Sequence, residues 1–320
     1  NKNCNIAIRR QICNKKGRHT MQAKTKGILQ EIGAELDRDR YPRIHNGGIV
    51  MPGETIVSTL NLGKEKINDT SRPGRPPAGW WQGSTRGQRQ AFQPRATRKT
   101  APIICSNLQA QYEGELDAVL EAYSSTKIWH QMIGLWLLTD SALLSGLGKK
   151  ATFLTFFPFN GRLRVRSWGF WTTAISSHWI GPRHTNYPDG SICAFEPLDQ
   201  TWIPSHGLIR LLDLFSLWAL RQLHLEVLGR WPGRQSAFHP YERMSELNDN
   251  EFCGCEGATR FYADCCKPKD IAKDIKAEAR DFLLKIPKCG LRKPPELISE
   301  FILGSKKLPP SADELPQAWF

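Results

Sequence analysis

The stretch HTNYPDGSICAFEPLDQTWIP, residues 184–204, joins a turn to a single thiol. Its Pro188-Asp189-Gly190 sequence is typical of a tight turn, because proline fixes φ, aspartate caps its own backbone and glycine accepts a positive φ. The turn leads into a short extended run that ends at Cys193. A thiol, the amide of Asn186 and the imidazole of His184 therefore lie close together in the chain. They could form a nucleophile with its oxyanion donor, or a polar loop around a buried cysteine.

The segments around this stretch predict an α+β fold. Over residues 107–123, apolar residues recur at helical spacing with carboxylates on the opposite face. Segments 128–138, 151–157 and 163–172 are rich in aromatic and β-branched residues and predict three consecutive strands of an antiparallel meander. An apolar helix is expected after Pro204, ending near Gly229. The predicted order is helix, meander, loop and helix.

Three groups of residues resemble the core of a ubiquitin-conjugating enzyme: His184-Thr185-Asn186, the run from Tyr187 to Cys193, and Trp202-Ile203-Pro204. In that family a His-Pro-Asn tripeptide leads through a turn to an Ile/Val-Cys pair, and a Trp-x-Pro opens the helix behind the active site. Here a threonine replaces the proline, and the interval from asparagine to cysteine is one residue shorter. These departures are typical of a divergent branch, similar to the conjugating enzymes of bacterial ubiquitin-like operons.

The resemblance implies a UBC-like fold with an N-terminal helix, an antiparallel β-meander, an active-site loop and C-terminal helices. Cys193 would accept a ubiquitin-like modifier from an activating enzyme as a thioester and pass it to a protein or other amine substrate. Asn186 would hydrogen-bond the developing oxyanion. His184 would hold the loop through backbone hydrogen bonds, and Trp202 would pack beneath the loop. The last two residues are thus expected to be structural parts of the active site.

Other functions stay open from the residues. A cysteine after an apolar residue is often a small buried hydrophobe. The chain would then be a non-catalytic, zinc-containing binding module with a basic nucleic-acid-binding arm. A cysteine hydrolase using Cys193 and a distant histidine is a third alternative, but the sequence lacks a recognisable histidine partner motif. It also lacks a glycine-rich phosphate loop, so a partner is expected to carry out activation with ATP.

A second group of cysteines predicts a metal site. The four thiols have the pattern Cys-x-Cys, nine residues, Cys-Cys, and they are Cys253, Cys255, Cys265 and Cys266. Four thiolates at this spacing can surround one tetrahedral zinc ion. The stretch also resembles the SEC-C motif found near the ends of many bacterial proteins, although Glu256-Gly257-Ala258 stands where that motif has Gly-Ser-Gly. With no open ligand position expected, the zinc would be structural.

The positive charge belongs to the first third of the chain. Residues 1–104 contain 20 Lys and Arg against 7 Asp and Glu, which equals the net charge of +13 for all 320 residues. Residues 71–101 are rich in Pro, Gly, Arg and Gln and are expected to be disordered. Arginines on phosphates and Trp80-Trp81 on bases would make this segment a nucleic-acid arm. A solvated linker is the favoured interpretation.

These patterns divide the chain into four parts. Residues 1–104 are expected to be a basic, largely disordered extension, of which 1–20 precede the first methionine and are a candidate for upstream translation. Residues 105–235 are the expected conjugating-like domain, 236–290 the zinc module with flanking helices, and 291–320 a C-terminal helix and tail. Without a secretory signal or an uninterrupted apolar span, and with clustered cysteines that suit a reducing compartment, a cytoplasmic protein with no membrane partner is expected.

Overall fold

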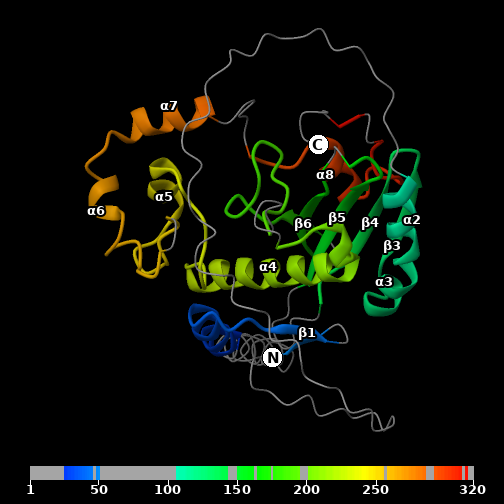
Figure 1. The fold of residues 1–320 in the computed structure, drawn as a ribbon, viewed down its shortest axis with the longest axis horizontal. Coiled ribbons are helices and arrows are strands. Elements are labelled where there is room, and N and C mark those ends of the chain that lie inside the picture. Colours follow the sequence, from blue (N-terminus) through cyan, green and yellow to red (C-terminus); the bar gives the residue numbers. More distant parts are fainter. Residues whose placement is uncertain are drawn as a thin grey trace, which may run out of the picture. The chain divides into compact units, whose positions relative to one another are not determined.

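The computed structural model describes most of the chain outside its first 24 residues and the segment 51–105 (Figure 1). The described residues are 25–45, 48–50, 106–142, 150–161, 164–173, 176–194, 201–255, 258–285, 292–311 and 314–315. The chain divides into two units, residues 1–54 with 103–320, and residues 55–102. The second unit, with most of the predicted disordered segment, lies outside the described residues. All described residues belong to the first unit.

In this unit the five strands β3 to β7 follow one another in the chain, and the helices α4 to α8 follow after them, as expected for an α+β fold. The helices are residues 25–37, α2 (Ser106–Gly114), α3 (Leu116–Ala122), α4 (Leu208–Leu228), α5 (Pro240–Glu246), α6 (Lys267–Asp270), α7 (Ile275–Lys285) and α8 (Glu296–Ile302), with a 3₁₀ turn, η2 (Pro204–His206). The strands are β1 (Arg43–His45), β2 (Gly48–Val50), β3 (Lys127–Gln131), β4 (Gly134–Asp140), β5 (Lys150–Pro158), β6 (Arg166–Thr172) and β7 (Ser177–Trp179).

The central sheet is an antiparallel meander of five strands in the order β3-β4-β5-β6-β7. The predicted α+β class and the antiparallel meander are therefore confirmed, although the sequence predicted three strands. The first predicted strand divides into β3 and β4 at a turn formed by Met132 and Ile133. Neither residue belongs to the Asn-Gly or Asp-Gly type that identifies a two-residue hairpin. The short β7 pairs with β6 and was also missed.

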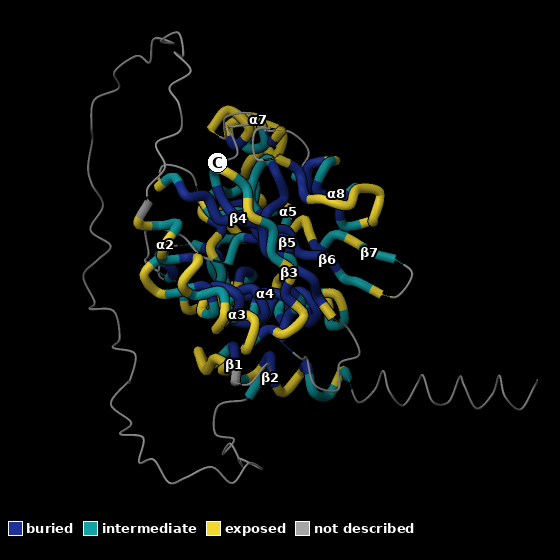
Figure 2. Tube along the Cα trace, turned by 90° about the vertical axis from the view of Figure 1, so that its right-hand side faces the viewer, coloured by how far each residue is buried: buried dark blue, intermediate teal, exposed yellow. Residues whose placement is uncertain are grey.

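Strand β5 is buried on both faces of the sheet, which explains its almost continuous apolar sequence. Its odd-numbered residues, among them Phe153 and Phe157, belong to the core shared with α2, α3 and α4. Its even-numbered residues Leu154 and Phe156 pack in a second core with Ile298 of α8. This alternation follows from the two-residue period of a strand. In Figure 2, strands β4 and β5 are coloured as buried along most of their length.

Helix α4 is the main support of the sheet and of the loop that precedes the helix. Eleven of its residues are buried, including the polar Ser216, Gln222 and His224. Gly207 and Gly229 cap the two ends of the helix. The sequence predicted the end near Gly229, whose φ of 71° gives a left-handed C-cap. Glu115, at the break between α2 and α3, accepts a hydrogen bond from the Leu208 backbone N–H at 2.5 Å. The carboxylate thus caps a helix 93 residues away in the chain.

The front of the chain differs from the predicted extension at residues 25–45 and 48–50. The helix at 25–37 buries Leu29, Ile32 and Leu36 against Leu220 and Leu223 of α4. The two short strands β1 and β2 follow it as an antiparallel pair. The helix was missed because its apolar residues are separated by charged and glycine residues, and their partner surface lies on α4. The other predictions for residues 1–24 and 51–104 lie outside the described residues.

The end of the chain matches the short helices expected there and returns to the sheet. The flanking helices expected within 236–290 correspond to α5 and α7, and the helix expected within 291–320 corresponds to α8. Beyond α8, Leu315 of the expected tail is 1% exposed and belongs to the core under α8. Among the described residues, none of the helices has the length and apolar character needed to span a bilayer.

Candidate functional site

The loop 181–194 is a tight, hairpin-like turn. Thr185 and Ile192 form an antiparallel bridge, and the Asn186 N–H donates to the Ser191 carbonyl at 2.7 Å. The Gly190 N–H donates to the Asn186 carbonyl at 2.9 Å, and Gly190 has a φ of 64°. The Pro-Asp-Gly turn predicted from the sequence thus has its glycine in the left-handed region.

The Asp189 carboxylate stabilises this turn from within. Its Oδ1 atom accepts hydrogen bonds from the Ser191 N–H at 3.0 Å and from the Ser191 hydroxyl at 2.8 Å. Both residues are buried, and Arg166 Nε of β6 lies 3.5 Å from Asp189 Oδ2. The Asp189 carbonyl accepts the indole N–H of Trp168 at 2.8 Å. The turn is thereby fixed on β6.

Cys193 follows the turn and is half-buried. Its backbone N–H donates to the His184 carbonyl at 3.1 Å, and the N–H of the preceding Ile192 donates to the Ser167 carbonyl of β6 at 2.7 Å. None of the described cysteines forms a disulfide. Hydrogen bonds thus fix the backbone that carries the thiol, and the residue is partly accessible to solvent.

The His184 imidazole is a packing element of the loop. It stacks on Trp231 with ring centroids 3.6 Å apart, and its Nε2–H donates to Gln235 at 3.0 Å. Burial, and then the neighbouring Arg183, hold the pKa of His184 well below its ordinary value. The ring is therefore neutral near pH 7. The His184 carbonyl accepts from Cys193 and from the Trp218 indole, which joins the loop to α4.

The Asn186 side chain also contacts the loop itself. Its Nδ2 amide donates to the Ile192 carbonyl at 3.0 Å and to the Ser191 hydroxyl at 3.2 Å. The amide therefore lies beside the peptide that leads into Cys193. Its two N–H bonds are both engaged in this conformation.

Trp202 follows Cys193 in the chain and anchors the segment between the loop and α4. It is 3% exposed, belongs to the core between the sheet and α4, and donates its indole N–H to the Gly207 carbonyl at 2.9 Å. The adjacent Pro204 carbonyl accepts from Gln111 of α2 at 2.6 Å. Trp202 thereby anchors the chain immediately before α4. The intervening residues 195–200 lie outside the described part.

A polar network missed by the sequence analysis holds the start of the loop. Arg183 donates to both carboxylate oxygens of Glu251, at 2.9 and 2.6 Å, and its carbonyl accepts from Gln222 of α4 at 2.6 Å. Glu251 is fully buried and also accepts the Trp231 N–H at 2.7 Å. Burial, the largest single effect, would raise the pKa of Glu251, but the hydrogen bonds and charge of Arg183 and the other hydrogen bonds to the carboxylate together outweigh it, and the pKa lies below its ordinary value.

The C-terminal segment contacts the same loop. Arg292 stacks over the Tyr187 ring at 4.4 Å and pairs with Glu246 of α5. A Cβ atom on Gly190 would lie 2.8 Å from the Lys293 backbone, so only glycine fits there without displacement. The contact of Arg183 with Glu251 and those of Arg292 with Glu246 and Thr185 join residues 46 to 107 positions apart, which no local pattern indicates.

The predicted metal ligands come together. The sulfur atoms of the four cysteines at 253, 255, 265 and 266 all lie within 4.8 Å of one another. Those of Cys255 and Cys265 are 3.6 Å apart, and those of Cys265 and Cys266 are 4.0 Å apart. A tetrahedron with metal–sulfur bonds of about 2.3 Å has sulfur–sulfur edges of about 3.8 Å. The cluster therefore has the size of a four-thiolate metal site.

Local backbone bonds shape this metal module, residues 251–270. Phe252 and Phe261 form an antiparallel bridge, and the Cys253 N–H donates to the Arg260 carbonyl at 2.9 Å. Helix α6 begins immediately after Cys266 and ends at Asp270, which forms a buried, bidentate ion pair with Arg243 of α5 at 2.7 and 2.8 Å. The module is thereby attached to α5.

A second group of possible ligands, His239, Glu278 and Asp281, has another explanation. The His239 Nδ1 atom accepts the Tyr241 N–H at 3.1 Å, so the proton is on Nε2, which donates to Asp281 at 3.0 Å. Both ring nitrogens are engaged in capping α5 and attaching α7. Glu278 and Asp281 also pair with lysines, so the three residues form a surface ion-pair group.

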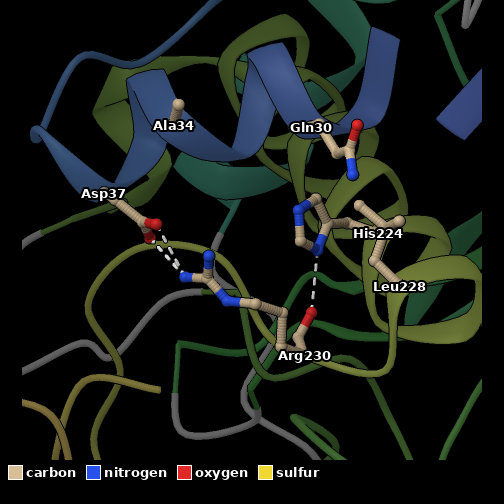
Figure 3. A pocket seen from close by; sticks show the side chains of 6 residues that line it. All are labelled: Gln30, Ala34, Asp37, His224, Leu228 and Arg230. Atoms are coloured by element: carbon tan, nitrogen blue, oxygen red, sulfur yellow. Dashed lines mark hydrogen bonds and ion pairs between the residues drawn. The ribbon is translucent and has the colours of Figure 1, made fainter. Parts of the chain in front are cut away.

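A pocket of about 280 Å³ lies between the helix at 25–37 and α4 (Figure 3). Gln30, Ala34, Asp37, His224, Leu228 and Arg230 line it. The Nη2 atom of Arg230 donates to both carboxylate oxygens of Asp37, at 2.8 and 2.7 Å, and His224 donates to the Arg230 carbonyl at 2.8 Å. These groups hold the two helices together. None of the predicted site residues lines this pocket.

No protein-family model matches the chain, and no matching curated protein or solved structure was found. Any function proposed for the chain therefore rests on the loop and the metal module themselves.

Proposed function

We propose that the protein is a ubiquitin-like protein conjugating enzyme with a UBC-like fold and Cys193 as its nucleophile. One observation carries the proposal. A half-buried thiol stands at the end of a turn held by Asn186 and Ser191, between an antiparallel meander and the helix α4. The order of α2, the meander, this loop and α4 is the order that the resemblance implies.

The chemistry would proceed by two acyl transfers. The Cys193 thiolate attacks the thioester carbonyl of the modifier on the activating enzyme, a new carbon–sulfur bond forms, and the activating enzyme's thiolate leaves. An amine of the substrate then attacks this new thioester, so a carbon–nitrogen bond forms as the carbon–sulfur bond breaks. The amine loses a proton to solvent or base, and Cys193 leaves as a thiolate.

Asn186 would donate to the oxyanion that develops when the amine attacks the thioester on Cys193. Its bond to the Ser191 hydroxyl, at 3.2 Å, is the longer of its two. Release of that bond frees one N–H for the substrate carbonyl, while the bond to Ile192 keeps the amide beside Cys193. The Asn186→Ala variant should then lose about a hundredfold in the transfer rate. An equal loss in loading and in transfer would mean that Asn186 only shapes the loop.

The nucleophile is tested with the modifier, its activating enzyme and ATP. The protein should form an adduct that thiol reductant cleaves, and Cys193→Ser should form a longer-lived oxyester that resists reductant. Cys105→Ser removes a thiol elsewhere in the chain and should behave like the parent protein. If Cys193→Ser still gave the reductant-sensitive adduct in equal yield, the nucleophile would be another cysteine.

The two alternative functions have less support. In a cysteine hydrolase a histidine would act as base, but the His184 ring points to Gln235 and Trp231 and has a lowered pKa. The nucleic-acid arm falls on residues that the structure does not describe. Affinity for nucleic acid that falls steeply with salt and disappears without residues 1–104 would support the arm.

We further propose zinc as the metal of the four-cysteine site and assign the zinc a structural role. Thiolates are soft ligands that favour zinc, and four of them leave no position for substrate. When bound, zinc would hold the two halves of the module together. A reducing compartment such as the cytoplasm would keep these thiols available for the metal.

A further inference from the structure

The metal module contacts the Cys193 loop through a buried carboxylate. Glu251 stands two residues before the ligand Cys253 and is 0% exposed. Its two oxygens bind Arg183 in a bidentate ion pair at 2.9 and 2.6 Å. The module therefore contacts the loop through an ion pair in which the carboxylate is fully buried and the Arg183 side chain is 12% exposed.

Gln235 duplicates this connection. Its Nε2 amide donates to the Glu251 carboxylate at 3.3 Å and to the Phe252 carbonyl at 3.1 Å. Its carbonyl oxygen accepts from Arg183 at 3.1 Å and from the His184 ring at 3.0 Å. One side chain thus contacts the metal module on one side and the loop on the other.

The connection continues by one step to the thiol. The His184 carbonyl accepts the Cys193 N–H at 3.1 Å, and His184 has a φ of 53°, a conformation that needs support from its surroundings. The ion pair of the preceding residue, Arg183, with Glu251 supports the backbone, and the hydrogen bond to Gln235 supports the His184 ring. A change at Glu251 would therefore alter the position of the His184 carbonyl, which accepts the hydrogen bond from the Cys193 N–H.

We propose that Glu251 is a positioning residue: it transmits the order of the metal module, through Arg183 and Gln235, to the loop that carries Cys193. The module is then more than a separate structural clip. This positioning role concerns the shape of the loop and does not depend on the proposed conjugating activity.

Amide exchange of the full-length, metal-loaded protein tests the role. The Cys193 and Asn186 N–H groups donate within the loop, whereas the Leu154 N–H in the centre of β5 reports global unfolding. Glu251→Gln removes the charge that holds Arg183 and should speed exchange at the two loop amides about tenfold or more. Alkylation of Cys193 by iodoacetamide, located by peptide mapping, should change in rate as well. Glu251→Asp keeps the carboxylate and should recover part of both effects.

Two comparisons keep the test decisive. Asp249→Asn changes an exposed carboxylate of the same segment and should leave loop exchange and bound metal unchanged. If Glu251→Gln lost its metal, Arg183→Gln would break the same pair from the loop side, away from the metal ligands, and should reproduce the faster exchange with the metal retained. Equal changes at the loop amides and at Leu154 would reduce Glu251 to a contributor to overall stability and overturn the proposal. Unchanged exchange of the loop amides in metal-loaded Glu251→Gln and Arg183→Gln would also overturn the proposal. Absence of modifier transfer in the parent protein, with these exchange changes still present in the variants, would count against the conjugating function alone.

Discussion

The Cys193 loop and the metal module both present thiols, but they obtain their shapes in different ways. In the module, the Cys253, Cys265 and Asp270 N–H groups bond to carbonyls less than eight residues away, and the ligands lie within 14 residues of sequence. In the loop, the decisive partners come from β6, α4, Glu251 and Arg292. One region is organised by short-range backbone bonds around four thiols that could hold a metal ion, the other by a folded scaffold.

The difference sets what each region depends on. Among the described residues of 251–270, Cys253 and Tyr262 are the buried apolar side chains, so a metal bound to the four thiols would supply much of the folding free energy of this segment. The loop depends on the large core between the sheet and α4, which includes Trp218 and Trp202. Substitution of a metal ligand should therefore first disorder the module, whereas substitution in the core between the sheet and α4 should first disorder the loop.

Loss of a metal ligand is the largest expected effect. Cys265→Ser removes one of four thiolates, and structural zinc sites are worth about 10–16 kcal/mol of apparent binding free energy. The variant should lose its zinc and show fast amide exchange throughout 251–270, measured by metal analysis and exchange mass spectrometry. Cys193→Ser should retain one zinc per chain. Full metal content and slow exchange in Cys265→Ser would show that three thiolates and local bonds suffice.

The buried ion pair between Arg243 and Asp270 is the next test of the module. The two side chains are 7% and 2% exposed, so Arg243→Met leaves a buried carboxylate without its partner and should cost about 3–5 kcal/mol in the free energy of unfolding. The exposed pair between Arg234 and Asp39 is the control, and Arg234→Met should cost less than about 1 kcal/mol. Denaturant unfolding at constant metal measures both. Similar costs would mean that water reaches Asp270.

The contrast also explains what the sequence could predict. The spacing of the four cysteines and the Pro188-Asp189-Gly190 turn are local patterns, and both predictions match the structure. The α+β order followed from the periodicity of helix and strand segments. The hairpin at Met132 was missed because turn propensity there is weak and tertiary pairing decides the register.

The missed parts of the site all depend on distant partners. Glu251 looks like any surface acid in the sequence, and only the fold places it under Arg183. Gln235 and Arg292 are equally ordinary until the chain brings them beside the loop. The helix at 25–37 was overlooked for the same reason, since its apolar residues find their partners on α4. Periodicity reports a face of an element, but not what covers that face.

Gly190 tests how closely the scaffold fits the loop. Alanine there would have a φ of 64° and a Cβ only 2.8 Å from the Lys293 backbone and from Trp179. Strain and overpacking together should cost about 2–4 kcal/mol. Gly229 has a similar φ of 71° but open space around it, so Gly229→Ala should cost only about 1–2 kcal/mol. Thermal unfolding compares the two. Equal costs would mean that the C-terminal segment does not press on the turn.

The smallest expected effect is a dependence of stability on pH that originates at His184. Burial and Arg183 lower its pKa in the folded state, whereas the unfolded chain binds a proton with a pKa of about 6.5. Below that pH the unfolded state holds more protons, so stability is present above it and is lost as the pH falls toward the folded pKa. Between about pH 7 and 5.5 the loss should be about 1 kcal/mol. His184→Gln should flatten this part of the profile in denaturant unfolding, leaving the contribution of the similarly buried His224. An unchanged slope would show that the ring is protonated in the fold, in conflict with its packing on Trp231.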